Sequence, residues 1–91
     1  MTYSYDLKPI HDSRKSFYGK AFVGVVENSR EKIITLWSYN TPVCEIYNGV
    51  FYRLWNGYSA TTMRHVNEFC AQYGINGGGK KWWDSLEVVA A

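Results

Sequence analysis

The chain has 91 residues, which is the size of one small domain. Its 8 Tyr, 4 Phe and 4 Trp are a high aromatic content that excludes intrinsic disorder, because disordered chains have few aromatics and a large net charge. Ten Lys and Arg against eight Asp and Glu leave a net charge of +2, which excludes a strongly acidic mimic of DNA and does not require a nucleic-acid partner.

Residues 1–16 are polar and hold no sustained hydrophobic period, and Pro9 disfavours a helix there. We therefore predict an extended N-terminal arm over 1–16, able to add an edge strand, followed by a single α+β domain over 17–91. The first twenty residues carry four Lys and Arg against two Asp, so the positive excess (4 − 2 = +2) lies at this end. They lack the apolar core of a signal peptide, and no apolar run approaches the roughly 18 residues of a membrane span, so we expect a cytoplasmic protein.

Between Gly19 and Trp55 the sequence predicts an antiparallel meander, because four β-rich segments are joined by short polar links. The first segment, AFVGVVE, is rich in β-branched residues that suit a pleated surface. In the second segment Ile34 and Leu36 share one face, whereas Trp37 lies on the other. The expected strands are 21–27, 32–39, 43–47 and 50–55.

Two turns separate the later strands. Asn48-Gly49 lies between two strand segments, and both residues accept the positive φ that a two-residue type I′ hairpin turn requires. Residues 40–42, Asn-Thr-Pro, are expected to form the preceding turn, because Asn tolerates turn dihedrals and Pro cannot donate to a strand ladder.

The clearest element is a helix at about 59–73. Ser59 is the expected N-cap, Gly74 fits the left-handed position after the last turn, and Ile75 is placed to contact Cys70 in a Schellman arrangement. The apolar stripe consists of Met63, Val66, Cys70 and Tyr73. The polar residues Arg64, His65, Glu68 and Gln72 lie off this stripe, so His65 is expected in solvent.

Together these elements predict an α+β fold, in which an antiparallel meander of four to five strands packs on one main α-helix. Phe22 and Phe69 are assigned to its core. After the glycine-rich loop 76–79 comes a short C-terminal element, whose pattern fits either a helix or a strand returning to the sheet.

No group of residues in the sequence predicts catalysis, a metal site or a cofactor. The two histidines, His11 and His65, and the two cysteines, Cys44 and Cys70, occur in neither a CxxC nor an HxxxH spacing. Segment 74–81 has the glycine spacing of a phosphate-binding loop, but it ends in Lys where that motif needs Ser or Thr. We expect a non-enzymatic protein with no cofactor, whose thiols are free and buried.

One helix covers one face of a sheet, so the opposite face is expected to present aromatic side chains. Trp37 and Tyr39 would lie there, and Arg53 would share that face with Phe51 and Trp55. Trp, Tyr and Arg are the residue types of protein-binding hot spots, and exposed aromatics also stack single-stranded nucleic acid. The predicted partner-binding residues are Trp37, Tyr39, Arg53, Trp55, Tyr58, Arg64, His65, Lys80, Lys81 and Trp82. In the alternative interpretation, the arm or the Trp82-Trp83 tail packs on this face instead.

Several stretches resemble a family of small uncharacterised proteins from phages and mobile elements of Gram-positive bacteria. They are FYGKA at 17–21, SYNT at 38–41, the turn at Trp55 and YSATTMRHVNEF at 58–69, and the resemblance spans residues 17–73. Its most specific part is S-A-T-T-x-R-H-x-x-E-F, in which packing leaves Arg64 and His65 unexplained. The family carries no established activity, but small cofactor-free phage proteins often inhibit host proteins. By analogy, the resemblance implies an anti-defence role of the anti-CRISPR type.

The leading hypothesis is a phage or mobile-element protein that binds a host or bacterial-defence protein, such as a CRISPR effector, and blocks it sterically. The alternative is a single-stranded nucleic-acid binder or DNA-associated regulator that uses Trp37, Tyr39, Arg53 and the loop at Lys80 and Lys81. A third hypothesis is a self-assembling protein, such as a homodimer, held together through an unpaired sheet edge.

Overall fold

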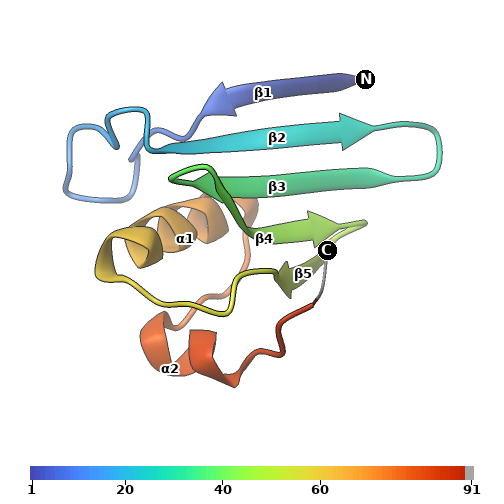
Figure 1. Cartoon of the computed structure of the whole chain (residues 1–91). Helices are drawn as coiled ribbons and strands as arrows, with labels where there is room; N and C mark the ends of the chain where they lie inside the picture. Colours follow the sequence, from blue (N-terminus) through green and yellow to red (C-terminus); the bar gives the residue numbers. More distant parts are fainter. Residues whose placement is uncertain (90–91) are drawn as a thin grey trace.

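The computed structural model describes residues 1–89 and has two layers, a five-stranded sheet and a layer of two helices (Figure 1). The strands are β1 (Thr2–Asp6), β2 (Ala21–Glu27), β3 (Lys32–Ser38), β4 (Thr41–Tyr47) and β5 (Val50–Arg53). The helices are α1 (Ala60–Tyr73) and α2 (Gly79–Ser85). The predicted α+β fold, with one main helix and a short C-terminal element, is confirmed.

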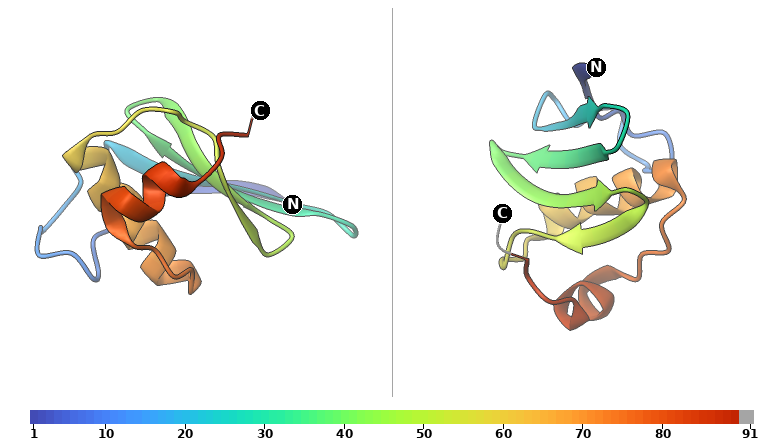
Figure 2. Two further views of the ribbon diagram at one scale, coloured as in Figure 1. Left: turned by 90° about the horizontal axis from the view of Figure 1, so that it is seen from below. Right: turned by 90° about the vertical axis from the view of Figure 1, so that its right-hand side faces the viewer.

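The sheet is a meander in which each strand pairs antiparallel with its neighbours in sequence, in the order β1-β2-β3-β4-β5. Val23 pairs with Leu36 and Val25 with Ile34, and all four side chains are buried. This alternation turns one face of the sheet toward the helices, and both helices lie on that side (Figure 2). The expected facing of Ile34 and Leu36 toward α1 is confirmed.

The turn between β3 and β4 lies earlier than predicted. The expected turn at 40–42 is wrong, because the chain turns at Tyr39 and Asn40, with φ values of 51° and 65°, and the next two residues begin β4. The pairing shifts register after Leu36, so that Trp37 lies opposite Pro42. Proline is tolerated in a strand at such irregular positions, where its missing N–H interrupts no regular ladder.

The hairpin between β4 and β5 confirms the predicted type I′ turn. Asn48 and Gly49 have φ values of 47° and 88°, both in the left-handed region. The Asn48 side chain also accepts a hydrogen bond from the backbone N–H of Lys32 at 2.8 Å, which ties this turn to the start of β3. After the turn, β5 is two residues shorter than expected, because the N–H groups of Leu54 and Trp55 both turn to the carbonyl of Val43.

Both predicted ends of α1 are confirmed. The Ser59 hydroxyl accepts a hydrogen bond from the N–H of Thr62 at 3.0 Å. At the other end Gly74 is left-handed, with a φ of 72°, and the N–H of Ile75 donates to the carbonyl of Cys70 at 2.8 Å. This last contact is the bond that defines a Schellman motif.

The N-terminal arm is part of the folded body. Strand β1 pairs with β2 along its whole length as an edge strand, and Leu7, which follows it, is 2% exposed in the core. The hydroxyl groups of Tyr5 and Tyr73 are hydrogen-bonded to each other, which joins β1 to the end of α1. The two tyrosine side chains therefore connect β1 to α1, which lie far apart in the sequence, on the helix side of the sheet.

The C-terminal segment forms a helix and then returns to the sheet. α2 places Trp83 in the core with no exposed surface, and Val88 forms a parallel bridge with Arg53 at the end of β5. The helix interpretation of this segment is therefore correct for 79–85, and its return to the sheet is limited to an isolated bridge at Val88. Across residues 1–89, neither helix has the length and apolar character needed to cross a membrane.

Candidate functional site

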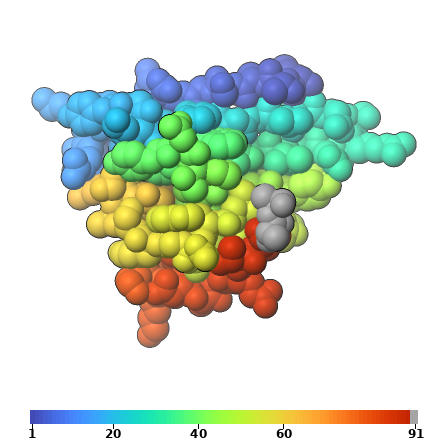
Figure 3. Space-filling view, in the orientation of Figure 1, coloured from blue at the N-terminus to red at the C-terminus, as the bar shows by residue number. Residues whose placement is uncertain are grey.

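The face of the sheet turned away from both helices is open, and we call it the outer face. It is directed toward the viewer in Figures 1 and 3, where the strands succeed one another from blue β1 downward and no helix crosses them. None of its side chains is buried, although neighbours partly shield many of them. Its residues are Thr2, Ser4, Asp6, Phe22, Gly24, Val26, Ile33, Thr35, Trp37, Pro42, Glu45, Tyr47, Val50 and Tyr52.

An aromatic pair lies on the outer face between β2 and β3. The rings of Phe22 and Trp37 are stacked, with centroids 5.7 Å apart and planes 3° from parallel. At the opposite end of the same face, Val26 and Val50 are 46% and 53% exposed. The assignment of Phe22 to the core is therefore wrong, whereas Trp37 lies on the face where the sequence predicts it.

The outer face is apolar and weakly acidic. Its only charged residues are Asp6 and Glu45. Beside it, the Tyr47 hydroxyl donates to Glu31 Oε1 at 2.8 Å, and this hydrogen bond raises the pKa of Tyr47. A partner for this face must therefore supply apolar contact and match two negative charges, Asp6 at the β1 edge and Glu45 in the middle of β4.

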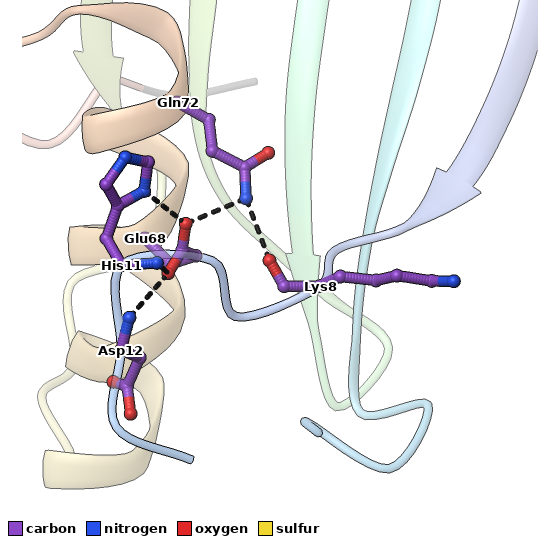
Figure 4. A network of polar contacts seen from close by, with 5 residues as sticks. All are labelled: Lys8, His11, Asp12, Glu68 and Gln72. Carbon is purple, nitrogen blue, oxygen red and sulfur yellow. Dashed lines mark hydrogen bonds and ion pairs between the residues drawn. The ribbon is translucent and has the colours of Figure 1, made fainter. Parts of the chain in front are cut away.

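A buried carboxylate joins the arm to α1 (Figure 4). The Glu68 side chain has no exposed surface, and Oε1 accepts the backbone N–H groups of His11 and Asp12 at 2.7 Å and 3.0 Å. Oε2 contacts Nδ1 of His11 at 2.8 Å and accepts a hydrogen bond from Gln72 at 2.8 Å. Gln72 also donates to the carbonyl of Lys8 at 2.8 Å. Glu68 is buried although it lies off the apolar stripe of α1, because the arm covers this side of the helix.

The charge on Glu68 is retained despite its burial. Burial by itself raises the pKa of a carboxyl, because the charged form loses hydration. Here the hydrogen bonds from His11, Gln72 and the N–H of Asp12 outweigh that effect, so the pKa of Glu68 lies below its ordinary value. The network is thus an ionised carboxylate that holds the arm in place.

The two motif residues without an explanation from packing, Arg64 and His65, both have structural partners. Arg64 donates to Asp12 in the arm at 2.9 Å, in a half-buried ion pair. His65 is 1% exposed, and its Nδ1 lies 2.8 Å from the Ser38 hydroxyl. The prediction that His65 is solvated is wrong, because residues 16–18 and the β3–β4 turn close over this side of α1. Ser38 is itself 2% exposed, so this pair is an interior hydrogen bond rather than an accessible nucleophile with its base.

We expect His65 to make stability depend on pH. Burial lowers the pKa of His65 below 6.5, and the nearby charge of Asp12 opposes this only in part. Below pH 6.5 the unfolded chain takes up a proton that the folded chain resists, so stability falls by at most about 1.4 kcal/mol per pH unit until folded His65 titrates. Urea unfolding from pH 7.5 to 5 should show this slope, and His65→Gln should flatten it. Equal slopes in both proteins would contradict the assignment.

Arg53 is an interior residue that connects β5 to α2. It is 6% exposed and donates to the carbonyls of Trp55 and Trp83 at 2.8 Å and of Gly57 at 3.3 Å. Its guanidinium carbon lies 4.5 Å from the centre of the Trp83 ring, whose indole N–H also donates to Gly57 at 2.9 Å. The prediction that Arg53 lies on the face opposite the helix is wrong, because Phe51 and Arg53 point toward the helix side, where α2 covers them.

The ten predicted partner-binding residues do not form one surface. Trp37 lies on the outer face, and Arg53 and Trp55 belong to the interior or pack against it. Tyr39, Arg64 and His65 gather where α1 begins. The remaining four, Tyr58, Lys80, Lys81 and Trp82, lie on or beside α2.

Around α2 the polar and aromatic contacts are local. Lys80 pairs with Asp84 at 2.7 Å and also lies 5.2 Å from the centre of the Tyr58 ring. Trp82 packs on Phe51, with ring centroids 5.4 Å apart. Both Lys80 and Lys81 are exposed, but neither is near Trp37, which is on the other side of the sheet. The residues named for the nucleic-acid alternative therefore do not lie together.

The described part of the chain, residues 1–89, contains no group of three or more His, Cys, Asp or Glu residues placed to hold a metal ion. Cys44 and Cys70 are free and buried. Burial raises the pKa of Cys70 to about 12 and that of Cys44 well above its ordinary value, so both thiols stay protonated at neutral pH.

The place of Tyr47 on the outer face is not predicted from the sequence. Tyr47 alternates with buried Ile46 along β4, and this period of two is the signal that identifies it. Glu68 gives no such signal, because a carboxylate off the apolar stripe of a helix is ordinarily exposed.

Comparison with known proteins gives a family and nothing more specific. No curated protein and no solved structure matches the chain. The model of a family of unknown function, DUF8033, matches residues 5–85, which run from β1 through α2 and include the arm as well as the helix motif. The match covers nearly the whole fold, and the chain therefore belongs to the DUF8033 family of unknown function.

Proposed function

We propose that this protein acts without catalysis, by binding another protein through the outer face and blocking it sterically. The resemblance to phage and mobile-element proteins of Gram-positive bacteria suggests the setting. There the target is a host or bacterial-defence protein, such as a CRISPR effector, in the cytoplasm of the host cell. This setting is analogy, whereas the choice of surface rests on the fold.

The observation that carries the proposal is the open outer face. A five-stranded sheet has two faces, and both helices of the described chain lie on the same one. The stacked pair of Phe22 and Trp37 and the exposed Val26 and Val50 leave apolar and aromatic area in contact with water. Large exposed apolar patches on small domains mark interaction sites, and aromatic anchors supply most of the binding energy at such sites.

The charges of the outer face indicate the chemistry of the partner. Asp6 and Glu45 are the charged residues among those assigned to this face, so it attracts an apolar surface that carries Lys or Arg opposite these two carboxylates. A nucleic acid requires the opposite, because its phosphates must be neutralised by Lys or Arg. We therefore favour a basic protein surface as the occupant of the outer face over a single-stranded nucleic acid.

The test compares three variants. Trp37→Ala removes the larger ring of the stack, Glu45→Lys reverses a charge on the same face, and Ala71→Lys adds a lysine at an exposed position on α1 as the control. Each tagged protein is incubated with Gram-positive host lysate, and proteins captured by the wild type are then titrated individually against all four forms. We expect at least about tenfold weaker binding for Trp37→Ala and Glu45→Lys, and unchanged binding for Ala71→Lys.

The charge reversal separates this proposal from the alternatives. A partner that binds all four forms equally, or loses only Ala71→Lys, would overturn the outer face as the binding surface. Binding of single-stranded DNA that strengthens with Glu45→Lys would instead favour the nucleic-acid hypothesis. Sedimentation of the free protein over a concentration series distinguishes self-association, which would appear without any lysate.

A further inference from the structure

A pocket of about 310 Å³ opens at the end of the sheet where α1 begins, and the proposed use of the outer face does not involve it. Phe17 and Tyr18 line it from the link between the arm and β2, Tyr39 from the β3–β4 turn, and Arg64 and His65 from α1. Small-molecule sites have volumes of roughly 300–1,000 Å³, so this pocket suits one small ligand rather than a chain.

Three cationic residues stand around the pocket, although most of its wall is apolar. Arg14, Lys20 and Arg64 contribute to its walls, and none of its lining residues is Asp or Glu. Arg64 is partly neutralised by Asp12, whereas within residues 1–89 Arg14 and Lys20 form no ion pair. Three cations around a concave surface favour an anion, and guanidinium groups in particular match the geometry of a phosphate.

Two tyrosines at the pocket have backbones that disfavour them. Tyr18 and Tyr39 have φ values of 53° and 51°, in the left-handed region where a side chain with a Cβ is unfavourable. Their side chains are 76% and 52% exposed, so packing within the chain does little to offset that cost. Residues held in such conformations cluster at binding sites, where the side chain contacts a ligand instead of contributing to the folded core.

The buried ring of His65 forms part of the wall of the same pocket. Its Nδ1 is bonded to Ser38, and its Nε2 has no hydrogen-bond partner among residues 1–89. The ring of Phe17 packs edge-on against it, with centroids 4.6 Å apart, which fixes the imidazole plane. The pocket therefore combines cations and two exposed aromatic rings above a buried, fixed imidazole.

We propose that this pocket binds one nucleotide, with Arg14, Lys20 and Arg64 around its phosphate and the rings of Tyr18 and Tyr39 against its base. Phosphate and base are the anion and the flat ring that these two sets of side chains recognise, and any base can stack on an aromatic ring. A free nucleoside monophosphate and the 5′-phosphorylated end of a single strand share this chemistry.

The experiment is an NMR titration of the ¹⁵N-labelled protein with AMP, adenosine and inorganic phosphate. We expect AMP to shift the amide signals of Tyr18, Gly19 and Tyr39, and to leave Thr35 on the outer face unchanged. AMP should bind at least about tenfold more tightly than either adenosine or phosphate, because only AMP engages both sets of side chains. A short oligo-dT with and without a 5′-phosphate then distinguishes a strand end from a free nucleotide as the source.

Two variants and one control make the assignment specific. Arg14→Ala should weaken AMP about tenfold, whereas Arg30→Ala, at an exposed arginine in the link between β2 and β3, should leave AMP binding unchanged. Tyr18→Gly should weaken AMP but leave the protein as stable as the wild type or more so, because glycine accepts the positive φ. If Tyr18 served folding alone, Tyr18→Gly would instead destabilise the protein and leave AMP binding unchanged.

The following outcomes would overturn the proposal. One is the absence of shifts at Tyr18 and Tyr39 at millimolar AMP. Others are equal binding of AMP and inorganic phosphate, which would leave no role for the rings, and equal effects of Arg14→Ala and Arg30→Ala. If oligo-dT binds equally with and without the 5′-phosphate and AMP does not bind, the pocket does not recognise a nucleotide. None of these results affects the test of the outer face, which uses other residues.

Discussion

Replacing Trp83 by Ala is expected to lower the free energy of unfolding by about 3–5 kcal/mol. Trp83 has no exposed surface, and its indole N–H donates to the carbonyl of Gly57. The substitution opens a cavity beneath the guanidinium of Arg53, which packs on the indole ring. A domain of 91 residues has a total stability of about 5–14 kcal/mol, so the variant should unfold at a far lower guanidinium concentration.

The control for Trp83→Ala is Lys81→Ala, at an exposed position on the same helix. We expect it to change stability by no more than about 0.5 kcal/mol. Equilibrium unfolding followed by circular dichroism gives both values. Similar midpoints for Trp83→Ala and the wild type would mean that α2 contributes little to the fold, contrary to the burial of its tryptophan.

Glu68→Gln is expected to cost about 2–3 kcal/mol, although it is nearly isosteric. The carboxylate receives hydrogen bonds from two backbone N–H groups, from Gln72 and from the side chain of His11. An amide keeps one accepting oxygen and turns an NH₂ group toward other donors, so part of the network is left unsatisfied. Urea unfolding should show the loss, and limited proteolysis should cut residues 8–16 faster than in the wild type.

Asp84→Asn is the matched control, because it makes the same chemical change at an exposed carboxylate. It should alter stability by less than about 0.5 kcal/mol. Acid adds an independent readout, because the pKa of Glu68 is lowered in the folded state. Its contribution is complete above the ordinary carboxyl pKa near 4.5 and is lost as the pH falls through the lower folded value. In Glu68→Gln the free energy of unfolding should therefore fall less steeply as the pH drops below 4.5. The same steepness as in the wild type would contradict the assignment.

The elements of this fold follow from local patterns, which explains why they could be predicted. The type I′ turn at Asn48 and Gly49 and the caps at Ser59 and Gly74 depend on the dihedrals and side chains of a few adjacent residues. The α1 stripe depends on spacing alone. The turn, the caps and the stripe can be predicted without knowing which elements pack against each other, and the structure has them at the predicted residues.

The positions of Arg53, His65 and Phe22 could not be predicted, for two physical reasons. Arg53 and His65 are polar groups whose burial depends on segments distant in sequence, α2 in one case and residues 16–18 in the other. Phe22 lies in a strand that is apolar on both faces, AFVGVVE, so alternation could not say which face meets the helix. The partners of Glu68 escaped prediction because they lie 56 and 57 positions away in the chain.

The two edges of the sheet are unequal. Beside β5, Val88 bridges to Arg53 and the N–H of Val89 donates to the Arg53 carbonyl at 2.8 Å, so the C-terminal segment occupies part of that edge. Beside β1 no described segment pairs with the strand. Fibril growth by strand addition needs two receptive edges on every copy, whereas pairing through a single edge is complete once two copies meet. The β1 edge is open along its whole length, whereas at β5 only the Arg53 end is covered, so the C-terminal segment shortens the second receptive edge without closing it.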